Sequence, residues 1–267
     1  MSAEVGYFGE EGSFSHRAAA RRFPGAALRP FSLVGQAFAA LGEVAQIVVP
    51  IENASSGVIP DTIDHLITAL PAGAAVRECL AMPIALALLA RKAGEEVRVV
   101  YSHAAALAHA RTWLAAHYPA ARLVPVESTS LAAKRAWEEP GAAALAGDQA
   151  ALLYGLETVR ADVQAGVPNR TKFYVIGKPV AGGPAATHTA LVCELPHTPG
   201  SLVGALQAVA AQGLNLTMIQ SRPIPGRFDE YRFFLEYEGT GEAALDALRP
   251  ATTALSVLGR YPIVEIA

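Results

Sequence analysis

The chain has 267 residues, 52% of them hydrophobic and 17% charged, so it can bury a substantial core and does not have the composition of a disordered protein. Its formal net charge of −3 argues against nucleic acid as the main partner, because phosphate binding requires a basic surface. The longest apolar candidate, Met82–Ala90, is too short to cross a bilayer, and Met1–Val5 lacks the basic and apolar regions of a signal peptide, so we expect no membrane association.

Short apolar runs alternate with helical patterns over the first two thirds of the chain. They predict strands at Val5–Phe8, Ile47–Ile51, Ile84–Arg91, Val97–Tyr101 and Phe173–Ile176. They predict helices at Ser15–Arg22, Thr62–Leu70, Ala104–His117, Ser130–Trp137 and Ala150–Tyr154. This alternation indicates an α/β fold with mostly parallel pairing. We expect residues 1–178 to form one domain of two lobes, the second lobe being roughly residues 80–163.

A stretch rich in proline and glycine, Lys178–Ala186, stops both helix and strand. After it, the pattern predicts in turn a strand, a helix, two strands, a helix and a strand, at Thr187–Leu195, Ser201–Gln212, Leu214–Ser221, Tyr231–Tyr237, Glu242–Leu248 and Tyr261–Ile266. This βαββαβ order is ferredoxin-like. We therefore expect residues 187–267 to form a second domain.

The two cysteines, Cys79 and Cys193, stand far apart and in different predicted domains. We interpret them as reduced core thiols in a reducing compartment, and we expect a cytoplasmic protein. A disulfide between them is the alternative.

Several common site motifs are absent from the sequence, namely G-x-G-x-x-G, G-x-x-x-x-G-K-[ST], H-E-x-x-H and G-x-S-x-G. The seven histidines do not cluster at ligand spacing, and His103 and His109 fall on different faces of a predicted helix. We therefore expect no metal and no cofactor. Ordinary side chains and backbone amides would carry any chemistry.

Four polar clusters stand where predicted strands end or helices begin, which is where open α/β folds bind ligands. In the first, Gly9–Ser15, glycines permit a tight turn and Ser15 can cap a helix whose N–H groups would suit a carboxylate. The second, Val49–Gly57, puts Glu52 and Asn53 directly after a buried strand, where a carboxylate is costly unless it is paired or functional. A plain capped turn and a hydrogen-bonded loop brace are the structural alternatives.

The third cluster, Val100–His103, includes Ser102 as a predicted helix cap, and His109 follows two turns later. Glu127–Ser130 predicts a further helix start that points at the same site. The fourth cluster, Asn169–Tyr174, has two cations and a hydroxyl before a strand. A cap with an ordinary helix histidine, and a solvated strand start, are the alternatives here.

Together and in this order, the clusters resemble the motifs of the prephenate dehydratase family. Gly9–Ser15 is similar to that family's G-P-x-G-T-F-S opening, and Pro50–Gly57 is similar to its P-I-E-N segment and the following loop. Its S-H, S-T and T-R-F elements resemble Tyr101–His103, Glu127–Ser130 and Thr171–Phe173. The resemblance extends over nearly the whole chain.

This resemblance implies a catalytic domain of two lobes like a periplasmic binding protein, and a reaction without cofactors. The family converts prephenate to phenylpyruvate, with loss of water and carbon dioxide, on the way to phenylalanine. Thr171 would hydrogen-bond the departing hydroxyl, and the other implied catalytic residues are Glu52, Asn53 and Ser102, with Glu52 as an alternative acid. The implied substrate-binding residues are Ser13, Phe14, His109, Thr129, Lys172 and Phe173.

Three positions depart from the family pattern. Lys172 replaces an arginine and so offers a point charge in place of a bidentate fork. His109 stands where the family often has glutamine, which adds a titratable group. Gln220 replaces a glutamate in the second domain and brings no charge.

The second predicted domain resembles the regulatory ACT domain that usually follows the catalytic one. Its G-A-L-V and E-S-R-P elements are similar to Gly200–Val203 and Gln220–Pro223. The resemblance implies a homodimer or homotetramer formed through these domains, with phenylalanine as the effector. The implied effector-binding residues are Gly200, Ser201, Leu202, Val203, Asn215, Leu216, Gln220, Ser221, Arg222 and Pro223.

Three other functions stay open from the sequence. The substrate could be arogenate, alone or beside prephenate, because the sequence does not distinguish the two. The chain could be an amino-acid sensor without catalysis, since the T-R-F element is altered. It could also be an interaction module that binds no substrate.

Overall fold

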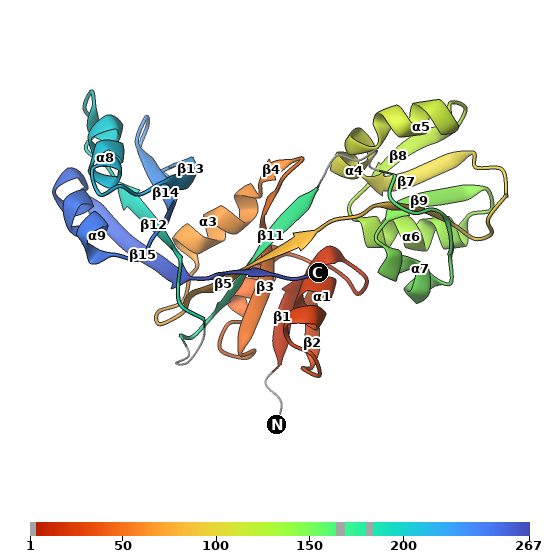
Figure 1. Cartoon of the computed structure of the whole chain (residues 1–267), viewed down its shortest axis with the longest axis horizontal. Helices are drawn as coiled ribbons and strands as arrows, with labels where there is room; N and C mark the ends of the chain where they lie inside the picture. Colours follow the sequence, from red (N-terminus) through yellow and green to blue (C-terminus); the bar gives the residue numbers. More distant parts are fainter. Residues whose placement is uncertain (1–3, 164–168, 180–183) are drawn as a thin grey trace.

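The computed structural model describes residues 4–163, 169–179 and 184–267 and contains three β-sheets. These sheets have seven, five and four strands. In Figure 1 the seven-stranded sheet lies in the middle, the five-stranded sheet with its helices on one side and the four-stranded sheet with its helices on the other. The predicted α/β class is confirmed. In the part of the chain that the structure describes, no helix is long and apolar enough to cross a membrane.

The seven-stranded sheet has the order β16-β5-β11-β3-β1-β2, with β4 paired to β3. Its strands are β1 (Val5–Phe8), β2 (Leu28–Phe31), β3 (Gln46–Asn53), β4 (Gly57–Val58), β5 (Ala75–Pro83), β11 (Arg170–Gly177) and β16 (Ile263–Glu265). Its helices are α1 (Phe14–Arg22), α2 (Val34–Ala39) and α3 (Pro60–Thr68). β1 is parallel to β2 and β3, whereas β11 is antiparallel to β3 and β5. The sheet is therefore mixed, and the prediction of mostly parallel pairing is wrong.

Alternate residues of β11 face two different cores of this sheet. Phe173 and Val175 pack in the cluster that α1 covers, and Tyr174 and Ile176 pack in the cluster that α2 and α3 cover. The second cluster continues into the C-terminal part of the chain, which contributes Phe234 and other buried side chains. One face of β11 thus packs against α1, and the opposite face packs against α2, α3 and the C-terminal part of the chain.

The five-stranded sheet has the order β10-β6-β9-β7-β8 and is also mixed. Its strands are β6 (Ala87–Ala90), β7 (Val99–His103), β8 (Arg122–Val126), β9 (Ala142–Ala146) and β10 (Glu157–Arg160). Its helices are α4 (Ala104–His109), α5 (Arg111–His117), α6 (Thr129–Glu138) and α7 (Asp148–Tyr154). The single helix predicted for 104–117 is two helices that meet at Ala110, a break that no residue type there predicts. We call this sheet with its helices the second lobe, and the seven-stranded sheet with its helices the first lobe.

The four-stranded sheet is antiparallel and has the order β13-β14-β12-β15. Its elements, which we call the C-terminal module, are β12 (His188–Glu194), α8 (Ser201–Ala210), β13 (Leu216–Pro223), β14 (Tyr231–Glu238), α9 (Glu242–Leu248), a 3₁₀ turn (Arg249–Ala251) and β15 (Ala254–Tyr261). This is the predicted βαββαβ order. Of the predicted break at Lys178–Ala186, residues 180–183 lie outside the described residues, and the others form no helix or strand.

The prediction that Tyr261–Ile266 forms the last strand of the C-terminal module is wrong. β15 ends at Tyr261, and Pro262 cannot donate to a ladder, so the chain leaves this sheet there. Ile263–Glu265 instead adds β16 to the first lobe, parallel to β5. Close approach of the two sheets requires Gly259, because a Cβ at this position would lie 2.2 Å from the carbonyl oxygen of Val76.

Cys79 and Cys193 are free and buried, as predicted. Cys79 packs in the first lobe and Cys193 in the C-terminal module. Burial raises the pKa of both thiols, which keeps them protonated.

Candidate functional site

Thr171 and Asn53 form a hydrogen-bonded pair across the neighbouring strands β11 and β3. The Asn53 Nδ2 donates to Thr171 Oγ1 at 2.8 Å and to Asn169 Oδ1 at 3.0 Å. The Asn53 Oδ1 accepts from the backbone N–H groups of Ser55 and Ser56, at 2.9 and 3.1 Å. The amide is therefore fixed in orientation, and the Thr171 oxygen receives a hydrogen bond while its own hydrogen stays available for donation.

Glu52 and Lys172 form a second pair on the opposite face of the same two strands. The Lys172 Nζ lies 2.9 Å from Glu52 Oε2 and 4.0 Å from Glu236 Oε1 of the C-terminal module. Because neighbouring residues of a strand point to opposite faces, this pair faces the C-terminal module while Thr171 faces the α1 side. The structure thus divides the predicted site residues into two groups and does not bring Lys172 or Glu52 beside Thr171.

The Gly9–Ser15 segment joins the first lobe to the second. Ser13, and not the predicted Ser15, caps α1, because its side chain accepts from the backbone N–H of His16 at 3.2 Å. Phe14 packs in cores of both lobes, and a Cβ at Gly147 would lie 3.1 Å from its ring. This loop therefore meets the start of α7.

An ion pair lies beside this junction. Arg17 of α1 pairs with Asp148 of α7 at 2.9 Å, and the Arg17 side chain is only 13% exposed. Charge and apolar contacts from α1 thus both hold the two lobes together.

Ser102 is not the predicted helix cap. It lies in β7 with no exposed surface, and its hydroxyl donates to the carbonyl oxygen of Leu145 at 2.7 Å. The strand continues two residues further than predicted, to His103, and His103 caps α4 by accepting from the Ala105 N–H at 3.3 Å. The hydrogen bond of Ser102 joins β7 to β9.

The predicted helix start at Glu127–Ser130 is confirmed. Ser128 caps α6 by accepting from the Leu131 N–H at 3.0 Å, and Thr129 is the first helical residue. Two polar atoms of the second lobe are buried without a hydrogen-bond partner among the described residues, namely His109 Nε2 at the end of α4 and Ser130 Oγ in α6. The sequence analysis predicted only that Ser130 lies at a helix start, and it did not predict a buried, unpaired hydroxyl there.

The predicted effector residues lie on α8 and on β13, an edge strand of the C-terminal module. Gly200, at φ +86°, precedes α8, and the Ser201 hydroxyl donates to the Thr198 carbonyl at 2.9 Å. Of the others, Val203 is 58% exposed, and Arg222 forms a two-pronged ion pair with Asp64 of α3. Arg222 is therefore bound to the first lobe. The remaining members of this set also lie on these two elements or beside them, namely Leu202, Asn215, Leu216, Gln220, Ser221 and Pro223.

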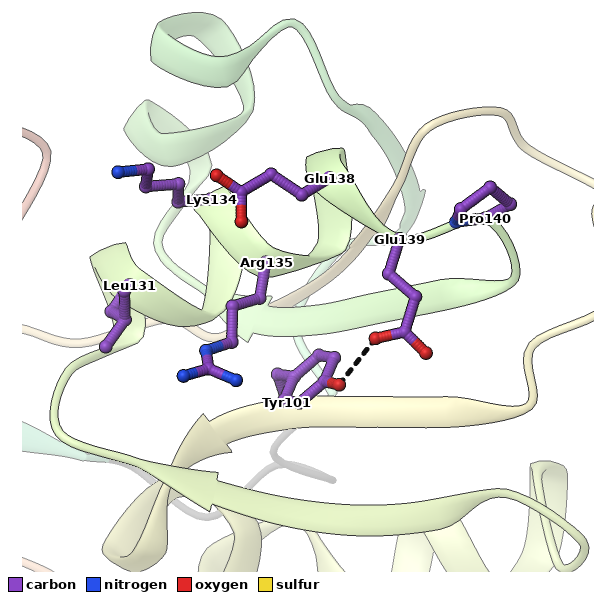
Figure 2. A pocket seen from close by; sticks show the side chains of 7 residues that line it. All are labelled: Tyr101, Leu131, Lys134, Arg135, Glu138, Glu139 and Pro140. Carbon is purple, nitrogen blue, oxygen red and sulfur yellow. Dashed lines mark hydrogen bonds between the residues drawn. The ribbon is translucent and has the colours of Figure 1, made fainter.

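A pocket of about 390 Å³ lies elsewhere, on the second lobe between β7 and α6. Figure 2 shows its lining, with the Tyr101 hydroxyl donating to Glu139 at 2.6 Å and Arg135 beside the Tyr101 ring. The lining contains two cations and two carboxylates and none of the predicted site residues. In the described ranges, no group of three His, Cys, Asp or Glu residues could hold a metal ion.

Comparison with known proteins gives one family match and several similar proteins. The pattern of the family described as "Prephenate dehydratase" matches residues 5–181. A bifunctional chorismate mutase/prephenate dehydratase of Aquifex aeolicus is 35% identical over 97% of this chain and 73% of the relative. A solved prephenate dehydratase of Arthrobacter aurescens, in complex with L-Phe, has a TM-score of 0.86 and 29% identity, covering 97% of this chain and 89% of the other. GqqA, described as a novel type of quorum quenching acylase, has a TM-score of 0.85 and 27% identity, covering 98% of each chain.

Proposed function

The chain belongs to the prephenate dehydratase family, and we propose that it converts prephenate to phenylpyruvate at the Asn53–Thr171 pair. In this reaction one carboxylate leaves as carbon dioxide and the ring hydroxyl leaves as water. Formation of the aromatic ring drives the step. The observation that carries the proposal is the hydrogen bond from Asn53 to Thr171, because it orients a hydroxyl for donation.

Thr171 acts as the donor to the departing hydroxyl. A neutral threonine is a poor acid, so its role is a hydrogen bond that strengthens as the C–O bond breaks rather than complete proton transfer. A positioned donor of this kind contributes roughly 10²–10⁴-fold to the rate. Asn53 keeps the Thr171 oxygen occupied, so the hydrogen points away from the amide.

The substrate is a dianion and needs polar groups that donate hydrogen bonds to its two carboxylates. The loop before α1 offers the start of a nine-residue helix with Ser13 as its cap, next to Phe14 at the lobe junction. We therefore propose Ser13 and Phe14 as substrate contacts. Phe173, on the α1 face of β11, supports this side of the proposed site. Thr129 and His109 are the second lobe's proposed contributions.

The C-terminal module is proposed to be an ACT regulatory domain that binds phenylalanine and pairs with a second copy. Its βαββαβ order, its exposed edge strand β13 and the L-Phe bound by the Arthrobacter aurescens relative support this proposal. We propose that residues 1–178 are the catalytic domain and 187–267 the regulatory one, in a cytoplasmic homodimer or homotetramer. Within the second range, Ile263–Glu265 adds a strand to the sheet of the catalytic domain.

The test is an assay of the purified protein with prephenate, with and without phenylalanine and without added metal. Phenylpyruvate formation that phenylalanine alters is the expected result, and arogenate in a parallel reaction measures substrate preference. Absence of turnover at every pH, with prephenate or phenylalanine still bound, would contradict an enzyme and indicate a sensor.

A further inference from the structure

Glu236 is a buried carboxylate of the C-terminal module with a complete set of donors. The residue is 1% exposed. Thr217 donates to its Oε1 at 2.6 Å, and the hydroxyls of Tyr174 and Tyr261 donate to its Oε2 at 2.7 and 2.6 Å. Three hydrogen bonds at this depth are what a carboxylate needs in order to stay ionised.

These donors come from three strands, and one of them belongs to the first lobe. Thr217 and Tyr261 lie on β13 and β15 of the C-terminal module, but Tyr174 lies on β11. The Tyr174 and Tyr261 hydroxyls are themselves 2.8 Å apart, and their rings meet edge to face at 5.2 Å. Glu236 thus binds β11 through the buried hydroxyl of Tyr174.

Lys172 extends this contact along β11. Its ammonium lies 4.0 Å from Glu236 Oε1 and 2.9 Å from Glu52 Oε2, so one cation stands between carboxylates of β14 and β3. Removal of any one of these three charges leaves the other two incompletely paired in partly buried surroundings. The two residues of β11 that face Glu236, Lys172 and Tyr174, stand on either side of Phe173.

Thr171 is the neighbour of Lys172 on the same strand, and a register irregularity follows directly at Lys172 and Phe173. An irregular strand end is less constrained by its ladder than a regular one. We propose that Glu236 is a positioning residue for the dehydration: through Lys172 and Tyr174 it fixes the end of β11 that carries the Thr171 hydroxyl. This inference rests on the proposed function, since it requires Thr171 to act on the substrate.

The test compares Glu236→Gln with a matched control in the same strand. Tyr237→Phe removes a hydroxyl from the opposite face of β14, in the core with Leu191 and Leu245, away from β11. We expect Glu236→Gln to lower kcat about 10- to 100-fold with KM changed less than about 3-fold, because small displacements of a catalytic group cost rate more than binding. Tyr237→Phe should keep kcat within about 2-fold.

A double-variant cycle tests whether Glu236 acts through Lys172. The combined Glu236→Gln and Lys172→Met protein should lose less kcat than the product of the two single losses, since the two changes share the Glu236–Lys172 contact. Losses that multiply independently would overturn this route. A Glu236→Gln protein with a lower Tm and unchanged kcat would show a purely structural carboxylate and would overturn the proposal.

Should Glu236→Gln fail to fold, Tyr261→Phe removes one of the hydrogen bonds and leaves every charge in place. It should then lower kcat about 3- to 10-fold, and an unchanged kcat would overturn the proposal. Wild-type protein that does not turn over prephenate contradicts the proposed function itself, which separates that failure from failure of the positioning role.

Discussion

Asn53 donates a hydrogen bond of 2.8 Å to Thr171 across the antiparallel pair of β3 and β11. The same amide is held at its oxygen by two backbone N–H groups of the following loop. Loop, amide and hydroxyl therefore form one chain of contacts, and a change at any point of it alters the direction of the Thr171 hydroxyl.

Asn53→Asp keeps the oxygen that accepts hydrogen bonds from the loop N–H groups. It replaces the amide N–H group that donates to Thr171 with a carboxylate oxygen. A second carboxylate oxygen beside Thr171 would attract the hydroxyl hydrogen away from the substrate and repel the dianion. We expect kcat/KM to fall about 10²–10³-fold with little change in Tm, because the loop contacts survive. Steady-state kinetics together with thermal unfolding check this, and a kcat/KM within 3-fold of wild type would contradict it.

Asp64→Ala should blunt the phenylalanine response as strongly as Arg222→Ala. The two side chains form one ion pair between α3 and β13, so either change removes the same contact. Both are partly exposed, so we expect a stability cost of only about 1 kcal/mol. The measurement is kcat/KM with and without phenylalanine for both variants, and unequal responses would show that Arg222 acts without Asp64.

The Glu236–Lys172 contact should hold over a wide pH range. Burial alone would raise the pKa of Glu236, but donors from Thr217, Tyr261 and Tyr174 and the charge of Lys172 lower it below its ordinary 4.5. Burial alone would lower the pKa of Lys172, but Glu52 and Glu236 raise it above its ordinary 10.5.

The depressed pKa of Glu236 stabilises the fold above pH 4.5, and this contribution is lost as pH falls through the lower folded-state pKa. The raised pKa of Lys172 stabilises the fold below pH 10.5, and its contribution is lost only at still higher pH. The Tm difference between wild type and Glu236→Gln should therefore be constant from about pH 5 to 9 and shrink in stronger acid. A difference that disappears near neutral pH would contradict these directions.

Gly259→Ala should loosen the contact between β15 and β5. The new methyl group would lie 2.2 Å from a backbone oxygen, so one of the sheets must shift. We expect a loss of about 1–3 kcal/mol in the free energy of unfolding, measured with urea. Gly204→Ala, in α8 with open space around its Cβ position, is the matched control and should be neutral or slightly stabilising.

The sequence predicted the alternation of strands and helices and the position of the motifs, but it placed the end of one strand too early and the start of another too late. The predicted strand ended at Ile51, which left Glu52 and Asn53 together in one loop. β3 in fact continues to Asn53, and neighbouring residues of a strand point to opposite faces. The same extension of β11 back to Arg170 separates Thr171 from Lys172.

For other parts of the fold, the local sequence gives no pattern that predicts the structure. β9 has the sequence AAALA, and alanine favours helices, so only burial between β6 and β7 makes it a strand. Glu236 lies within an otherwise apolar run of β14, which marks a costly carboxylate, but its partners come from positions 19 to 62 residues away along the chain. Such partners are set by tertiary packing alone.

The most direct measurement of the central claim is the kcat of Thr171→Val with prephenate, beside Thr171→Ser. Valine keeps the shape of threonine without its hydroxyl, and serine keeps the hydroxyl without the methyl group. We predict that valine lowers kcat at least about 10²-fold while serine retains activity within about 10-fold. A Thr171→Val protein that keeps wild-type kcat would contradict a reaction at the Asn53–Thr171 pair.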